Sequence, residues 1–173
     1  MRTSWWFDFA CPEFGGYASL EFGERRARWA AAFVGAGWPL VAVRADDIHP
    51  QRPEFRTDGL WGSVTEDQVG MEAFGAVFDD PAEAWGEERG DIVPFGFDLQ
   101  WDGERCSGDV LIGDDRIEVD CPGSRTPLVG VVAPIRWLSP VKPDTVHALC
   151  DVDGVMRWVS WYDQTSLPPG SPG

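Results

Sequence analysis

Short apolar segments, each closed by turn-forming residues, recur along this chain. The clearest spans residues 92–101, where the side chains of one face alternate with those of the other: Phe95, Phe97, Leu99 and Trp101 against Gly96, Asp98 and Gln100. A period of two is typical of a strand with one buried face. Similar segments predict strands at residues 17–22, 28–34, 39–44, 60–66, 71–78, 110–112, 117–120, 146–150 and 155–162.

Several of these segments are joined by loops short enough to fix a hairpin. Gly35-Ala36-Gly37 and Gly113-Asp114-Asp115 each separate two apolar strands. Only residues 81–88 suggest a helix, and strands do not alternate with helices as in a parallel α/β protein. We therefore expect an all-β fold, a single antiparallel barrel of about 8–10 strands with at most one short helix.

The length of 173 residues suits one globular domain. No linker or internal repeat divides the sequence, so residues 1–165 are expected to form that domain. Residues 166–173 are rich in proline and glycine and are expected to be a flexible tail.

The charge of the chain excludes two classes of partner. Lys and Arg number 14 against 29 Asp and Glu, a formal net charge of -15. Such a surface repels phosphate backbones and anionic lipid headgroups, so we expect neither a nucleic acid nor a membrane as partner. No apolar run is long enough for a membrane span and no signal peptide is visible, so a cytoplasmic location is expected.

The four cysteines lie far apart, at positions 11, 106, 121 and 150. There is no Cys-x-x-Cys pair and no histidine at metal-binding spacing, so no metal site and no cofactor are expected. We interpret these cysteines as small buried apolar residues in a reducing compartment.

Groups for proton transfer are few. His49 precedes a proline in a polar segment and is expected to be an exposed loop residue, whereas His147 begins a strand and could point inward. Asp8, Glu72 and Asp98 lie between apolar neighbours. Burial among such neighbours would raise a carboxyl pKa and allow acid catalysis, but strand alternation would equally place all three on the solvent face.

The aromatic content is high, with 10 Trp and 10 Phe. A barrel of roughly eight strands can hold one small ligand, and ligand sites are mostly apolar. The rings therefore either line a cavity or simply fill the core.

Several short motifs resemble a known family, the lipocalin-like carotenoid hydratase and tocopherol cyclase superfamily. The resemblance covers about residues 4–137 and rests on residues 4–9, 15–20, 70–75, 79–86 and 94–99. It implies a lipocalin-like barrel. Members commonly carry two barrels, and this chain has room for the first only. Their Asp-His pair and a nearby tryptophan are replaced here by Thr126, Pro127 and Val129, so their acid chemistry is not expected.

Related lipocalin-like proteins include Diels-Alderases, which need no cofactor because they act by holding a substrate in its reactive conformation. The resemblance therefore suggests a cofactor-independent cyclase that promotes intramolecular [4+2] cycloaddition of a hydrophobic polyketide or terpenoid intermediate. It would act as a monomer or homodimer. The expected substrate-binding residues are Trp61, Phe74, Phe97, Trp137 and Trp158, and the expected polar groups near a substrate carbonyl are Gln100, Arg136 and His147.

Two other functions fit the same composition. A carrier would hold an apolar metabolite without transforming it. An acidic interaction protein, such as an immunity protein against a basic toxin, would use the net charge of -15 directly.

Overall fold

The computed structural model describes residues 3–35, 38–49, 53–78, 91–128, 132–142, 145–152 and 155–160. All the regular secondary structure in these ranges is β-strand, which confirms the predicted fold class. The short helix expected at residues 81–88 lies outside the described residues.

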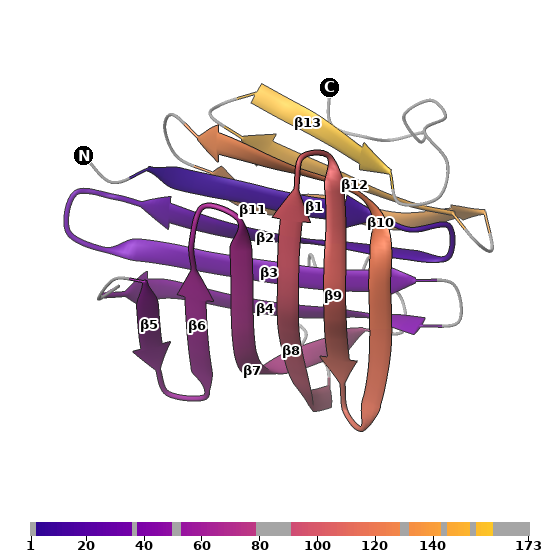
Figure 1. Cartoon of the computed structure of the whole chain (residues 1–173), viewed down its shortest axis with the longest axis horizontal. Helices are drawn as coiled ribbons and strands as arrows, with labels where there is room; N and C mark the ends of the chain where they lie inside the picture. Colours follow the sequence, from indigo (N-terminus) through magenta and orange to yellow (C-terminus); the bar gives the residue numbers. More distant parts are fainter. Residues whose placement is uncertain are drawn as a thin grey trace.

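Ten antiparallel strands form the main sheet (Figure 1). They are β1 (Ser4–Ala10), β2 (Phe14–Phe22), β3 (Ala27–Gly35), β4 (Trp38–Ile48), β5 (Glu54–Thr57), β6 (Leu60–Val64), β7 (Gln68–Phe78), β8 (Asp91–Asp102), β9 (Arg105–Ile112) and β10 (Asp115–Leu128). Pairing of β4 with β7 closes eight of them into a barrel in the order β4-β3-β2-β1-β10-β9-β8-β7. This closed antiparallel barrel is consistent with a lipocalin-like one. Strands β5 and β6 extend the sheet beyond β7.

The barrel is flattened into two layers whose strands cross. In Figure 1, β1 to β4 run across the view and β5 to β10 run up and down in front of them. Two strands pass between the layers. The first part of β7 pairs with β6 and its last residues pair with β4, while β10 pairs first with β9 and then with β1. Strands that change layer in this way make the corners of orthogonal β packings.

Each corner strand carries a glycine where the backbone is crowded. A Cβ atom on Gly75 of β7 would lie 2.8 Å from Cγ1 of Val41. One on Gly123 of β10 would lie 2.6 Å from the backbone oxygen of Asp8. Larger residues would push the two layers apart at these places.

The predicted alternation in β8 is confirmed. Phe95, Phe97, Leu99 and Trp101 are buried, and Asp98 and Gln100 are exposed. The buried face of each strand meets the opposite layer in one core. Alternation therefore assigned the two faces of this strand correctly.

Aromatic rings fill much of that core. Trp29 packs against Phe55 with ring centroids 5.1 Å apart, and its indole Nε1 donates to Sδ of Met71 at 3.1 Å. Phe95 and Phe97 meet edge to face at 4.9 Å. A Cβ atom on Gly62 would overlap the ring of Phe55. The described core is thus largely built from ring packing, one of the two alternatives that the composition left open.

A second, three-stranded antiparallel sheet follows the barrel strands in the sequence. It consists of β11 (Val132–Lys142), β12 (Thr145–Val152) and β13 (Val155–Ser160), in that order. The predicted hairpin near residues 146–162 corresponds to β12 and β13. Within the ranges described, the chain forms no helix of the length and apolarity that crossing a membrane requires.

Candidate functional site

An open groove of about 370 Å³ lies on the outer surface of the barrel, beside the corner where β7 changes its partner. Residues from β5, from the turn after it, from β6 and from β7 line it: Arg56, Thr57, Gly59, Leu60, Trp61, Glu72, Ala73 and Phe74. The volume falls in the range typical of small-molecule sites, about 300–1,000 Å³.

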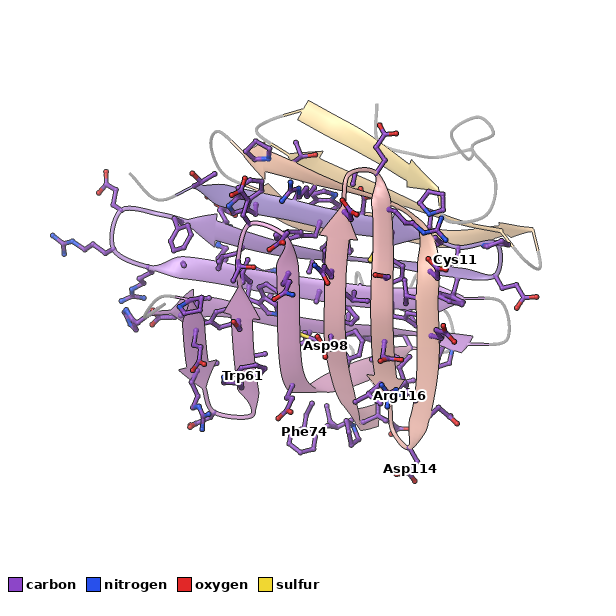
Figure 2. The ribbon with its side chains drawn as sticks, viewed as in Figure 1. Cys11, Trp61, Phe74, Asp98, Asp114 and Arg116 are labelled. Atoms are coloured by element: carbon purple, nitrogen blue, oxygen red, sulfur yellow. A yellow bond between two sulfur atoms is a disulfide. The ribbon has the colours of Figure 1, made fainter. Side chains whose placement is uncertain are left out.

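Two aromatic side chains are exposed to this groove. Phe74 is 61% exposed and Trp61 is half-buried. Seven of the ten phenylalanines are buried and two are half-buried, so Phe74 is the most exposed of them. Figure 2 shows the two side chains on neighbouring strands near the lower end of the front layer. An exposed aromatic pair beside a groove is a common feature of sites that bind apolar molecules.

Both rings lie close to glycines on the adjacent chain segment. A Cβ atom on Gly70 would lie 3.3 Å from Cη2 of Trp61, so the indole covers Gly70. One on Gly59 would lie 3.7 Å from Cδ2 of Phe74. Gly59 belongs to the two-residue turn between β5 and β6, has φ of +74°, and accepts a hydrogen bond from the Phe74 backbone N–H at 3.2 Å. The Phe74 ring therefore packs on the turn before β6, and the Trp61 ring packs on β7.

The two charged residues of the groove lie on either side of Trp61 in the strand register. Arg56 on β5 and Glu72 on β7 are both opposite Trp61 in the strand register, on its two sides. Both are exposed, and neither has an ion-pair or hydrogen-bonded side-chain partner among the described residues. The groove thus combines an aromatic wall with a cation and an anion that are unpaired within the described part of the chain.

The other predicted site residues in the barrel lie elsewhere. Phe97 is buried inside, with its ring against Phe95 and Phe9. Gln100 is exposed on the outer face of β8, opposite Gln68. The structure therefore brings Trp61 and Phe74 together and separates Phe97 from them by the thickness of the sheet.

The remaining four predicted residues lie in the three-stranded sheet, where only the backbone is described. Trp137 of β11 and Trp158 of β13 both pair with Leu149 of β12, so they share one cross-strand row. His147 pairs with Ser139 and Ser160, and Arg136 lies where the β11–β12 register shifts. Their predicted roles stay predictions.

The three carboxylates singled out in the sequence differ in position. Glu72 and Asp98 are exposed, as strand alternation predicted. Asp8 is half-buried and accepts from Nε1 of Trp6 at 2.9 Å and from the backbone N–H and Oγ of Ser124 at 3.0 and 2.9 Å. Asp8 therefore ties β1 to β10, which is a structural role.

The interpretation of the cysteines is wrong for two of them. Cys11 and Cys121 form a disulfide with their Cα atoms 5.2 Å apart, whereas Cys106 is free and buried. The pairing joins residues 110 apart in sequence, so spacing alone gave no sign of it. Burial, and next the charge of Asp8, raises the pKa of the Cys106 thiol to about 12.

Charged pairs elsewhere on the outer face involve arginines of β9 and β10. Arg105 contacts Asp120 at 2.6 Å, and Arg116 donates to Asp109. The hydrogen bond from Arg116, and next its charge, lowers the pKa of the Asp109 carboxyl. Among the side chains that the structure describes, no three His, Cys, Asp or Glu residues are grouped to hold a metal ion.

Sequence reasoning identified Trp61 and Phe74 but missed Arg56, Thr57 and Leu60 as groove residues. The Asp58-Gly59 turn was the available signal, since Asp-Gly between two strand-like segments typically makes a two-residue hairpin. No family model, curated protein or solved structure matches this chain.

Proposed function

We propose that this protein binds a small, largely apolar molecule, and that the groove between Trp61 and Phe74 is the binding site. The observation that carries the proposal is the presence of both rings in one groove of about 370 Å³. Leaving a phenyl ring 61% exposed forgoes the stabilisation of burial, about 25 cal/mol per Å² of apolar area. A ligand that covers the ring recovers it.

The groove is set in rigid surroundings. Leu60 and Ala73 are buried, and they pair across β6 and β7 beneath it. The backbone N–H of Phe74 donates to the carbonyl of Gly59, and Phe74 lies opposite Pro94 of β8 in the strand register. A site held by paired strands needs little ordering when a ligand binds, which favours affinity.

Cyclisation is the finer form of this proposal. A molecule folded against Trp61 and Phe74 would have its reactive ends close together, and such orientation can contribute about 7–11 kcal/mol in favourable cases. Depletion of a linear polyene by the pure protein would indicate a cyclase, whereas binding without depletion would indicate a carrier. A Trp61→Ala variant should lose either activity.

An NMR titration tests the binding itself. Benzyl alcohol, a neutral aromatic probe, should shift the backbone amides of Gly59, Leu60 and Ala73 in a ¹H–¹⁵N spectrum of the intact protein. Trp61→Ala and Phe74→Ala should abolish these shifts. Ile92→Ala is the matched control, because Ile92 is 66% exposed on the neighbouring strand and does not line the groove. Shifts at core residues, or none, would overturn the proposal.

A further inference from the structure

The charges of the groove define a class of ligand more closely than its rings do. Arg56 and Glu72 lie in the same cross-strand row as Trp61, one on each side of it. With strands about 4.8 Å apart, their Cα atoms are separated by roughly 10 Å. Their side chains are long enough to reach over the indole from opposite sides.

The side chains of Arg56 and Glu72 do not form an ion pair with each other. Elsewhere on the same outer face, guanidinium and carboxylate groups pair directly, as Arg105 does with Asp120 at 2.6 Å. Arg56 and Glu72 make no such pair with each other or with another described side chain. Trp61 lies between them in the strand register, so among the described residues both charges are left without a partner that a bound molecule would have to displace.

From this arrangement we propose that the groove selects a zwitterionic aromatic ligand. Its ring would lie between Trp61 and Phe74, its anionic group at Arg56 and its cationic group at Glu72. This inference rests on the proposed binding function and adds the polarity of the ligand to it. A planar anionic group such as a carboxylate matches the guanidinium, which donates two parallel hydrogen bonds.

The net charge of the protein explains why both charges are needed for selection. At -15, the surface repels anions in general, so a singly negative aromatic acid gains little from Arg56 alone. A singly positive amine is attracted to the whole surface and has many places to bind. A zwitterion carries no net charge, so its preference for this site comes from the local pair.

Four probes of similar size test whether the groove prefers a zwitterion to an anion, a cation or a neutral molecule. They are 4-(aminomethyl)benzoic acid, whose amine and carboxylate lie at opposite ends of a benzene ring, together with benzoate, benzylamine and benzyl alcohol. Dissociation constants are measured from the groove amide shifts of the intact protein. Exposed ion pairs are modest, so we expect the zwitterion to bind up to about fivefold tighter than benzoate or benzylamine for each added contact.

Variants test whether Arg56 binds the anionic group of the ligand and Glu72 its cationic group. Arg56→Gln should remove the preference for the zwitterion over benzylamine. Glu72→Gln should reduce the affinity for the zwitterion to the affinity for benzoate. The double variant Arg56→Glu/Glu72→Arg keeps both charges with their places exchanged and should restore the preference. Arg25→Gln and Glu118→Gln change the net charge equally at exposed positions outside the groove and should have no effect.

The outcomes separate this inference from the function on which it rests. If benzyl alcohol binds in the groove but the zwitterion binds no tighter than benzylamine, the zwitterion inference is wrong and the binding function stands. If the zwitterion is preferred but the preference survives Arg56→Gln and Glu72→Gln, the inference is also wrong. If no probe shifts the groove amides, both proposals fail.

Discussion

Cys11 and Cys121 form a disulfide that joins the end of β1 to the corner of β10. The same corner holds the hydrogen bonds of Asp8 to Ser124 and the donation from Nε1 of Trp101 to the backbone oxygen of Asp8 at 2.9 Å. One corner of the barrel is therefore closed by covalent and polar links. The other, at β7, carries the open groove beside it.

Removing the disulfide should destabilise the barrel. The bond closes a loop of 110 residues, and loops of this length lose much conformational entropy in the unfolded chain when they are closed. We expect the Cys11→Ala/Cys121→Ala variant to lose about 2–5 kcal/mol in a urea unfolding experiment. A reductant should lower the free energy of unfolding of the native protein toward that of the variant. It should leave the stability of the variant unchanged. Equal stability of the two proteins would contradict this.

The disulfide also bears on the cellular location. Structural disulfides persist mainly in oxidising compartments, whereas the sequence predicted a cytoplasmic location. That location stays a prediction. A peptide map of the protein from its native cells, made without reductant after rapid alkylation, would show whether Cys11 and Cys121 are bonded there.

Cys106 should be unreactive in the folded protein. It lies opposite Cys121 in the β9–β10 register, is fully buried, and has a thiol pKa raised to about 12 by burial and by Asp8. The reactive thiolate is therefore scarce near neutral pH. Iodoacetamide at pH 8 should modify Cys106 only after unfolding, as peptide mass spectrometry would show. Rapid modification of the native protein would contradict the burial.

The same pKa predicts a loss of stability in alkali. The unfolded thiol ionises near its ordinary pKa of 9.0, whereas the folded thiol, with its pKa of about 12, keeps its proton to higher pH. The stabilisation is complete below pH 9 and declines as the pH rises toward 12, because the unfolded state then binds fewer protons than the folded state. Unfolding free energies measured from pH 8 to 11 should fall less steeply for Cys106→Ala than for the native protein.

Asp8 should stabilise the β1–β10 junction. Its carboxylate accepts three hydrogen bonds, from Trp6 and twice from Ser124. Asp8→Ala leaves these donors unsatisfied and should cost about 1–3 kcal/mol in urea unfolding. Asp8→Asn keeps one acceptor oxygen and should cost less. If both variants unfold like the native protein, the carboxylate does not hold the junction.

The fold was predictable to the extent that it depends on local pattern. Alternation located β8 and assigned Phe95 and Phe97 to the buried face, and short glycine turns predicted the hairpins. Closure of the barrel was not readable in detail, because it depends on β7 leaving β6 for β4 beyond Phe74. A change of partner strand leaves no periodic signal in the sequence.

The candidate site was predictable only in part, for a related reason. Alternation separates the two faces of a strand but does not say which face is inside, so Trp61, Phe74 and Phe97 were assigned to one pocket. Phe74 follows Glu72 by two residues on the outer face of β7, beside Trp61, whereas Phe97 points into the core from β8. Which aromatic residues meet depends on tertiary packing.

That difference between two phenylalanines gives a direct test of the site. Phe97→Ala removes a buried ring that contacts Phe95 and Phe9, and it should lower the free energy of unfolding by about 3–5 kcal/mol. Phe74→Ala removes a ring that is 61% exposed and should change it by no more than about 0.5 kcal/mol. Urea unfolding measures both. If Phe74→Ala is as destabilising as Phe97→Ala, the Phe74 ring is part of the core, and its exposure cannot be an argument for a binding site.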